Sequence, residues 1–316
     1  MMDNSTDRKC ARDGEQQLDP HSPVAIGQIF RATDIAFMIY GAGCAIAWFS
    51  VGSADSYWWA FALANCAVVL VFGLLPRLGV PAGGAKTHPL AFRAVLTILV
   101  LPFHFNQIGL IIGHLRPDAH LQIEAWLIQA DRWLFATDPT RWIERWHHPV
   151  LTELLQWIYA SFYFLPFILA YFLLRQGQKR NLAKLLFALV AGFLLSYVGY
   201  LLMPARSPHY VLHTPAPLEG VLAAEAIWEL LIAQWGINKF DAFPSGHTGV
   251  SLILLFYAWR WSRKAFGILL PIVSTLIFST VYLRFHYFID LSAGTALAVV
   301  TIGLTWYVSH WGLQCR

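Results

Sequence analysis

Charged residues are scarce in this sequence of 316 residues. Lys, Arg, Asp and Glu together make up 13% of it, whereas about 25% is usual for a soluble globular chain. With a hydrophobic content of 57%, this scarcity excludes a soluble enzyme, a nucleic-acid-binding module and a disordered scaffold. The formal net charge is only +4 and is dispersed along the chain, so no groove for a polyanion is indicated.

Cysteine is also scarce, and no secretion signal is visible. Cys10 and Cys315 lie in the tails, while Cys44 and Cys66 lie inside apolar stretches, so no disulfide framework can be recognised. Residues 1–30 are polar and lack the apolar core of a signal peptide. We therefore expect no cleaved signal peptide.

Long hydrophobic runs, in contrast, are abundant. A helix needs about 20 apolar residues to cross the hydrocarbon of a bilayer. By that measure there are eight candidate spans, at 34–52, 57–75, 91–114, 151–174, 182–203, 246–262, 265–283 and 288–311. The 14 Trp residues suit a protein that lines two membrane–water interfaces. We expect an all-α, polytopic membrane helical bundle of about eight transmembrane helices, without the doubled halves typical of many transporters.

The distribution of basic residues predicts how the spans are oriented, because Lys and Arg are enriched in cytoplasmic loops. Most of the 22 Lys and Arg residues fall on the same side as the two termini. We therefore expect cytoplasmic termini and odd-numbered loops on the outside of a cell (inner) membrane.

Two of the outside loops are long. In 115–149, apolar residues recur at helical spacing with polar residues between them, which predicts an amphipathic helix in the interface; they are Ile123, Trp126, Leu127, Ala130, Trp133 and Leu134. The loop 204–242 begins with a Pro-rich stretch and is expected to continue as a short helix from Leu218 to Trp235. We divide the chain into a polar cytoplasmic tail (1–32), N-terminal spans with the interfacial helix (33–149) and a membrane core (150–316).

Three polar clusters fall at the outer ends of the later spans. They are Pro204-Ala205-Arg206-Ser207-Pro208, Phe243-Pro244-Ser245-Gly246-His247 and Arg284-Phe285-His286-Tyr287-Phe288-Ile289-Asp290. Charged groups and imidazoles at membrane depth are costly, and the predicted topology puts all three clusters on one face. We therefore expect them to form one site, which makes 150–316 the catalytic part of the chain.

The second cluster has the pattern of a helix start. Ser245 precedes a long apolar run and is a good N-cap residue. Free N–H groups at such a position favour an anion, Gly246 lets the backbone approach it closely, and His247 lies in the first turn. The alternative interpretation is a plain helix cap.

The other two clusters supply a histidine, a carboxylate and two arginines. His286 and Asp290 would share a face of a helix, so that the carboxylate holds one ring N–H and leaves the other nitrogen as a nucleophile; the alternative is a structural His–Asp pair. Arg206 and Arg284 carry fork-shaped cations suited to phosphate oxygens; the alternative is snorkelling to the interface.

Together these residues are suited to phosphoryl transfer through a phosphohistidine. His286 would attack phosphorus, and His247 would protonate the leaving oxygen and then deprotonate the incoming water or alcohol. No carboxylate cluster suits Mg²⁺ and no His/Cys set has zinc spacing. We expect a metal-independent reaction with no cofactor.

The motifs resemble those of the type-2 phosphatidic acid phosphatase superfamily, KxxxxxxRP, PSGH and SRxxxxxHxxxD. PSGH is complete at 244–247, and the third motif matches Ser279, His286 and Asp290. The resemblance implies a six-helix phosphatase-type core in which His286 is the nucleophile, Asp290 its orienter and His247 the acid/base. It also implies that the phosphate ligands are Arg206, Ser245 and Gly246.

The chain departs from that pattern at three positions. Gly199 stands where the family has lysine, and Ser207 separates Arg206 from Pro208 where the family has proline directly after arginine. Thr280 stands where the family has a second arginine. If the seventh span stays helical, Arg284 lies one turn further on the same face and supplies that charge. The local sequences around Arg206 and His286 resemble most those of a subgroup that includes the inositol phosphorylceramide synthases.

Other polar residues are assigned smaller roles. His209 is a possible substrate contact because it lies three residues after Arg206, and Asp241 is expected to brace the turn before the second cluster. On the third span, interhelical hydrogen bonds are the expected role of His104, Asn106, Gln107 and His114.

The sequence thus predicts an integral membrane phosphatase or phosphotransferase acting on a phospholipid or other amphiphilic phosphate. The first alternative is an inositol phosphorylceramide synthase-like transferase that moves a phospho-headgroup to a lipid alcohol. The second is a transporter or flippase, although such proteins hold substrates near the bilayer midplane. We expect an active site that faces the periplasm or lumen, membrane lipids as partners, and no nucleic acid; the oligomeric state is not indicated.

Overall fold

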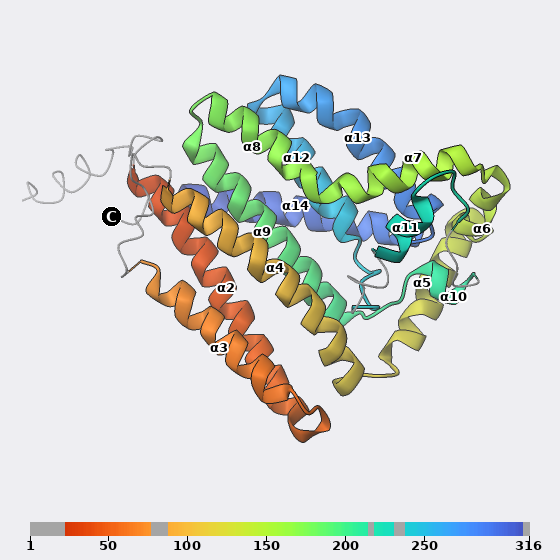
Figure 1. Ribbon diagram of the computed structural model, residues 1–316, viewed down its shortest axis with the longest axis horizontal. Helices are drawn as coiled ribbons and strands as arrows, with labels where there is room; N and C mark the ends of the chain where they lie inside the picture. The colour runs from red at the N-terminus through yellow and green to blue at the C-terminus, as the bar shows by residue number, and fades with distance from the viewer. Residues whose placement is uncertain (1–22, 77–87, 214–217, 231–237, 312–316) are drawn as a thin grey trace, which may run out of the picture.

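A computed structural model describes residues 23–76, 88–213, 218–230 and 238–311 (Figure 1). Within these ranges the chain is all-α, and an isolated bridge between Ala205 and Asp241 is its only strand-like pairing. The predicted fold class is therefore confirmed. The N-terminal tail and the end of the predicted 218–235 helix lie outside the described residues.

The bundle is built from long apolar helices. They are α2 (Pro23–Val51), α3 (Trp58–Leu74), α4 (His88–Leu115), α7 (Pro149–Ala160), α8 (Leu165–Arg175), α9 (Lys179–Leu202), α12 (Gly246–Trp261), α13 (Arg263–Tyr282) and α14 (Phe288–Trp311). The 3-10 turn η3 (Ser161–Phe164) joins α7 to α8, so that these form one broken span. Short elements cover one end: α5 (Ala119–Phe135), α6 (Pro139–Ile143), η2 (Glu144–Trp146), α10 (Pro208–Val211) and α11 (Ala224–Glu229).

Every predicted span corresponds to a helical segment of the described chain. Six of these segments are long and apolar enough to cross a membrane. The other two, α3 and α12, have 17 and 16 residues and fall just short of the roughly 20 that a full crossing needs. The polytopic character of the bundle is confirmed.

Helix α9 lies at the centre of the molecule. On one side its apolar residues pack against α8, α12 and α14, and on the other side against α2 and α4. Figure 1 shows α2, α3 and α4 together on one side of α9, with α8, α12 and α13 on the other. A helix that is apolar on all faces is expected to be buried in this way. The division of the chain at 149–150 stays a prediction, since α9 packs against both parts.

Glycines allow α12 and α14 to cross closely. A methyl group added at Gly294 would lie 2.5 Å from the carbonyl oxygen of Ser245, and one at Gly249 would lie 2.5 Å from Leu297 Cδ2. Small residues are typical where membrane helices approach backbone to backbone. The crossing brings the beginning of α12 next to the beginning of α14.

A buried polar network ties the first helices together. The Gln107 side-chain oxygen on α4 accepts hydrogen bonds from Trp48 Nε1 on α2 (2.9 Å) and from Asn65 Nδ2 on α3 (2.7 Å). This confirms the interhelical role predicted for Gln107. His104 pairs with Gln107 of its own helix, so its contribution to the network is indirect.

Candidate functional site

The three polar clusters meet at one end of the bundle, at the right of Figure 1. They follow the ends of α9 and α13 and precede the beginnings of α12 and α14. Two backbone hydrogen bonds join their loops, from Ala242 N–H to the Ala205 oxygen (3.1 Å) and from Ser245 N–H to the Asp290 oxygen (3.1 Å). The structure thus brings together segments about 85 residues apart in the sequence, as the predicted topology requires.

The beginning of α12 offers backbone donors to an anion. Ser245 is the N-cap, and its buried hydroxyl accepts a hydrogen bond from Thr248 N–H (3.2 Å). Within the described ranges, the N–H groups of Gly246 and His247 have no acceptor. A methyl group at Gly246 would lie 2.6 Å from the Tyr200 hydroxyl, so only glycine fits this close contact. The cap predicted from the sequence is present, and the anion site stays a prediction.

His286 is held in one tautomer by a backbone carbonyl. Its Nδ1 lies 2.9 Å from the Ala242 oxygen, and a carbonyl can only accept, so Nδ1 carries the proton. Nε2 then has a free lone pair, and it lies 3.5 Å from His247 Nδ1. Burial lowers the pKa of His286 to about 4, which keeps the ring neutral and nucleophilic near neutral pH.

Aromatic rings position His247. Its ring centroid lies 4.6 Å from that of Tyr159 and 4.4 Å from that of Phe162. These rings come from α7 and η3, where the fourth span is broken. His247 Nε2 is buried and has no hydrogen-bond partner in the described chain, so it can serve a ligand. The sequence analysis did not identify either aromatic residue as part of the site.

Asp290 contacts His286 in a different way from that predicted. His286 precedes α14, which begins at Phe288, so the expectation that both lie on one helix is wrong. The reason is that the Asp290 carboxylate accepts Tyr287 N–H (2.9 Å) and so turns the chain into the helix. The same carboxylate oxygen lies 3.4 Å from His286 Nδ1, beyond the stronger bond to Ala242.

Asp241 is the second carboxylate near His286. The bridge to Ala205 fixes the backbone beside it, consistent with the bracing role predicted for this residue. Burial raises its pKa to about 6. Burial lowers the pKa of His286, whereas the negative charge of Asp241 raises it, because the charge favours the protonated ring.

A carboxylate holds the guanidinium of Arg206. Arg206 Nε and Nη2 donate to the two oxygens of Glu124 at 2.8 and 3.1 Å, and the Arg206 backbone N–H donates to the first of them at 3.0 Å. The hydrogen bonds to Glu124 raise the pKa of Arg206. One edge of the guanidinium is thereby fixed, while the Nη1 edge remains for a phosphate oxygen.

Arg284 does not continue the seventh span. Helix α13 ends at Tyr282, and Arg284 has a left-handed backbone with φ of 66°. The expectation that Arg284 lies one helical turn above Thr280 is therefore wrong, because the chain reverses before it. The Arg284 side chain forms an ion pair with Glu144. Within the described chain, no hydrogen bond or ion pair joins this side chain to His247 or His286.

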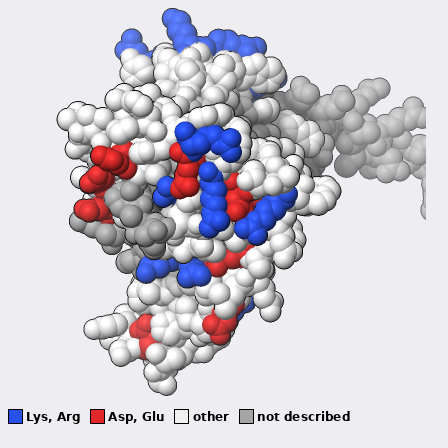
Figure 2. Space-filling model, turned by 90° about the vertical axis from the view of Figure 1, so that its right-hand side faces the viewer, with Lys and Arg blue, Asp and Glu red and all other residues white. Residues whose placement is uncertain are grey.

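Acidic and basic residues alternate over this end of the molecule. Figure 2 shows Lys and Arg interleaved with Asp and Glu on this face, rather than one positive patch. Arg206 is paired with Glu124, and Arg284 is paired with Glu144. In addition, Arg132 and Arg141 contact Asp138. The arginines predicted to bind phosphate therefore sit in a nearly charge-balanced environment.

His209 is buried beside the site. Its ring is 1% exposed, and neither ring nitrogen has a partner in the part of the chain described. The ring meets Phe285 edge-on, with centroids 5.8 Å apart, and its backbone N–H donates to the Arg284 oxygen. Burial lowers its pKa to about 4. The predicted substrate contact stays a prediction.

The position of the missing lysine has no room for a side chain. A methyl group at Gly199 would lie 2.3 Å from Pro244 Cδ. Helix α9 therefore packs directly against the turn that precedes α12. The departure from the lysine motif follows from this close packing.

Two further carboxylates reach the site from α5. Asp131 accepts hydrogen bonds from the N–H groups of Phe288 (2.9 Å) and Ile289 (2.8 Å), and Glu124 holds Arg206. The buried face of α5 consists of Glu124, Leu127 and Asp131, whereas Trp126 is 48% and Trp133 84% exposed. The predicted amphipathic helix is present, but two of its acids lie on the buried face and two of its tryptophans lie on the exposed face. The spacing of the two acids, seven residues apart around Leu127, was the available signal.

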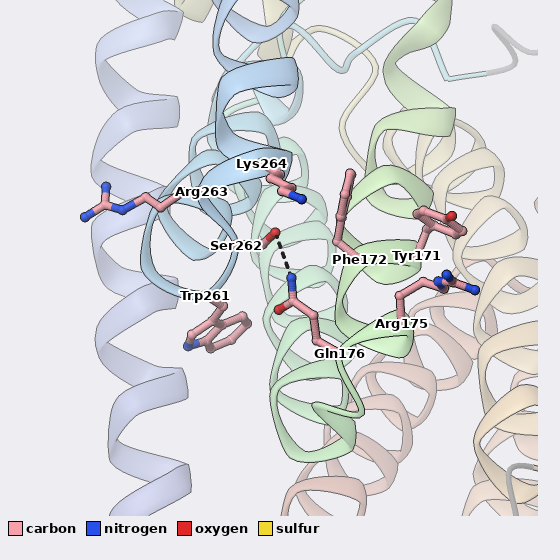
Figure 3. Close-up of a pocket in the computed structure, with 8 residues that line it drawn as sticks. All are labelled: Tyr171, Phe172, Arg175, Gln176, Trp261, Ser262, Arg263 and Lys264. Atoms are coloured by element: carbon pink, nitrogen blue, oxygen red, sulfur yellow. Dashed lines mark hydrogen bonds between the residues drawn. The ribbon is translucent and has the colours of Figure 1, made fainter.

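A separate hollow of about 450 Å³ lies at the far end of α12, between α8 and the α12–α13 turn (Figure 3). Arg175, Arg263 and Lys264 contribute to its lining. None of the predicted site residues lines it. The hollow is therefore distinct from the candidate site.

Comparison with known proteins gives one family and two relatives. A family model described as the PAP2 superfamily matches residues 125–304. Inositol phosphorylceramide synthase of Candida albicans (strain SC5314 / ATCC MYA-2876) is 29% identical over 184 residues, 52% of this chain and 39% of that protein. Lipid A 1-diphosphate synthase of Escherichia coli (strain K12) is 26% identical over 131 residues, 41% of this chain and 52% of that protein.

The matches cover only part of the relatives. The chain spans less than two fifths of the first relative's length and about half of the second's. No solved structure matches it.

Proposed function

Because the chain belongs to the PAP2 superfamily, we propose that it is a membrane enzyme that acts on a lipid phosphate ester through a phosphohistidine at His286. The observation that carries this proposal is the tautomer of His286. Its Nδ1–H is committed to the Ala242 carbonyl at 2.9 Å, which leaves Nε2 as a nucleophile beside His247. A base held by a third group in this way is the usual arrangement of an activated catalytic histidine.

The reaction proceeds in two displacements. His286 Nε2 attacks phosphorus, the bond from phosphorus to the leaving oxygen breaks, and that oxygen takes a proton from His247. Water or an alcohol then gives its proton to His247 and attacks phosphorus, and the phosphorus–nitrogen bond breaks. Because His286 Nε2 lies 3.5 Å from His247 Nδ1, the incoming phosphate has to separate these two nitrogens in order to reach His286.

The phosphate oxygens meet donors from two segments. The N–H groups of Gly246 and His247 point from the positive end of α12, and the free edge of Arg206 supplies a fixed cation. Charge that develops on the oxygens in the transition state is stabilised by such preorganised donors. We assign Arg284 and His209 to the periphery of the substrate, where they lie beside Phe285.

Charge balance favours transfer of a phospho-headgroup as the second candidate function. Each arginine is paired with a carboxylate, and Gly199 excludes a lysine. This suits the single negative charge of a phosphodiester better than the double charge of a phosphomonoester. The similarity to inositol phosphorylceramide synthase supports the same choice, with an alcohol in the place of water.

The test is turnover by purified protein in detergent or liposomes. A panel of labelled phospholipids, with phosphatidic acid as the monoester and phosphatidylinositol as the diester, is offered with and without a lipid alcohol such as ceramide or diacylglycerol. We expect release or transfer of the phospho-headgroup that survives EDTA and is inhibited by orthovanadate.

Four outcomes are informative. Turnover of the diester only with the alcohol favours the transferase, and turnover of the monoester in water favours the phosphatase. Activity that is lost in EDTA and restored by Mg²⁺ contradicts the metal-independent mechanism. Movement of intact lipid between leaflets without cleavage supports the transporter alternative instead.

A further inference from the structure

Helix α5 lies outside the three motifs, yet it contacts two of them through buried carboxylates. Glu124 and Asp131 have exposed fractions of 3% and 2%. Burying an ionised carboxylate is costly unless it is well hydrogen-bonded. Each of them is bonded only to a catalytic segment in the described structure: Glu124 to Arg206, and Asp131 to the beginning of α14.

Asp131 acts as the N-cap that α14 lacks. Its two oxygens accept the N–H groups of Phe288 and Ile289, and Asp290 accepts that of Tyr287. Three successive N–H groups at the start of α14 are thus satisfied by carboxylates, and the next, that of Asp290, donates to the Tyr287 carbonyl. The helix therefore begins at a fixed place two residues after His286.

Glu124 determines which edge of Arg206 is presented. The Glu124 carboxylate accepts hydrogen bonds from Nε and Nη2, which fixes the plane of the guanidinium. It also accepts the Arg206 backbone N–H, which fixes the point where the side chain leaves the main chain. Without it, a half-exposed arginine would sample many rotamers. Leu127, fully buried between the two acids with Ala205, Ala242 and Tyr287, holds the helix against both loops.

We infer that Glu124 and Asp131 are positioning residues: Glu124 aligns Arg206 on the phosphate, and Asp131 sets the place of His286 through the start of α14. The inference rests on the proposed function, in which Arg206 binds phosphate and His286 attacks it. It assigns α5 a part in catalysis although α5 touches no reacting atom.

The test for Glu124 is a double-mutant cycle with Arg206. Glu124→Gln keeps the shape of the side chain but removes its charge and one acceptor, and hydrogen bonds to charged groups typically contribute a factor of about 10 to 100. We expect kcat/KM on the turned-over phospholipid to fall about 10- to 100-fold and the inhibition constant of orthovanadate to rise. In an Arg206→Ala background the same substitution should change both by less than about threefold, because its target is gone.

Asp131→Asn keeps one acceptor and loses the charge. We expect kcat and the rate of phosphoenzyme formation to fall about tenfold while KM stays within about twofold, because the substrate contacts are unchanged. Asp118→Asn is the matched control, since Asp118 is an exposed acid next to the same helix and its side chain makes no cap bond. Thermal unfolding of each variant measures any loss of folded protein.

The outcomes separate this inference from the proposed function. Wild-type protein with neither turnover nor vanadate inhibition overturns both. If the wild type is active and Glu124→Gln behaves like Asp118→Asn, or lowers kcat/KM equally in both backgrounds, the inference is wrong and the function stands. A fall in Tm with unchanged kcat per folded molecule would make both acids structural only.

Discussion

At the scale of single residues, the site depends on which groups are left without a partner. His247 Nε2 and the first N–H groups of α12 have no hydrogen-bond partner in the described structure, and His286 Nε2 has only a long contact of 3.5 Å with His247 Nδ1. Ser245, Asp290 and Arg206 are partly or fully committed to partners. Buried polar groups in native proteins are usually satisfied. Their accumulation at one place therefore indicates where a ligand completes the structure.

His286→Ala should abolish turnover and the acid-labile phosphoenzyme. The reason is that His247, the other histidine of the pair, has no ring nitrogen bonded to the Ala242 carbonyl and so is not prepared as a nucleophile. His247→Ala should slow turnover about 10²- to 10⁴-fold, the usual contribution of general acid–base catalysis, while a phosphoenzyme still forms. Rapid-quench labelling of both variants measures this. Retention of more than a few per cent of the activity by His286→Ala would show that the nucleophile lies elsewhere.

The pH dependence should report the environment of His286. The nucleophile must be neutral, and its pKa of about 4 extends the neutral range to lower pH than the ordinary value of about 6.5. We expect the acid limb of kcat/KM to lie nearer pH 4 than pH 6.5.

Asp241→Asn should leave that limb nearly in place. Burial raises the pKa of Asp241 to about 6, so its carboxyl is mostly neutral near pH 4 and its replacement removes little charge from the surroundings of His286. The pH profile of kcat/KM for this variant, with Asp118→Asn as the control, measures the position of the limb. A shift of about one pH unit or more would contradict it.

The sequence could reveal the reactive side chains but not their partners. Arg206, His247, His286 and Asp290 lie in short motifs with a chemical meaning, so each could be chosen from the sequence. The Ala242 carbonyl could not, because any residue type supplies one. The Glu144 partner of Arg284 could not be chosen either, since 140 residues separate them.

At the scale of elements, the relation between α12 and α14 sets the distance between the two histidines. His247 is in the first turn of α12, and His286 directly precedes α14. The crossing at Gly249 and Gly294 has no space for a methyl group. A side chain there would force the two helix beginnings apart.

Gly294→Ala should therefore lower turnover about tenfold or more, since small displacements of catalytic groups are costly, and destabilise the fold by about 1–3 kcal/mol through overpacking. Gly303→Ala is the control on the same helix. Nothing lies within 4 Å of an added methyl there, and replacing a helical glycine by alanine stabilises by up to about 1 kcal/mol. Turnover and thermal unfolding of both variants decide the matter; equal behaviour would show that the crossing is adaptable.

Helices were predictable where hydrophobic runs were long, and their exact ends were not. The fourth span appeared continuous in the sequence, but it is broken by η3, which supplies Phe162 to His247. The seventh ended before Arg284 because that residue adopts a left-handed backbone. The turn at Arg284 has no local signal, since no glycine or proline stands there, whereas Pro166 directly after η3 was an available signal for the break in the fourth span.

At the scale of the whole molecule, the candidate site lies at one end of the bundle, and exposed basic residues gather at the opposite end around the α12–α13 turn; they are Arg260, Arg263 and Lys264. The basic residues predict that this second end is cytoplasmic. Orientation cannot be derived from the arrangement of helices alone, because a bundle fits a bilayer equally well in both directions.

Introduced cysteines would determine the orientation. In a background that lacks Cys10, Cys44, Cys66 and Cys315, a membrane-impermeant thiol reagent on intact cells should label Leu222→Cys, at a position that is 89% exposed. It should label Arg263→Cys only after lysis. The reverse pattern would place the catalytic histidines on the cytoplasmic side.

The two faces of α5 link the site to the thickness of the membrane. Its acids hold Arg206 and the beginning of α14, while Trp126 and Trp133 face outward, where indole rings settle at the level of the lipid headgroups. A bilayer thicker or thinner than the bundle draws such anchors away from the depth set by the spanning helices. Hydrophobic mismatch would then act on the alignment of the phosphate site through one helix, which makes bilayer composition a determinant of the rate.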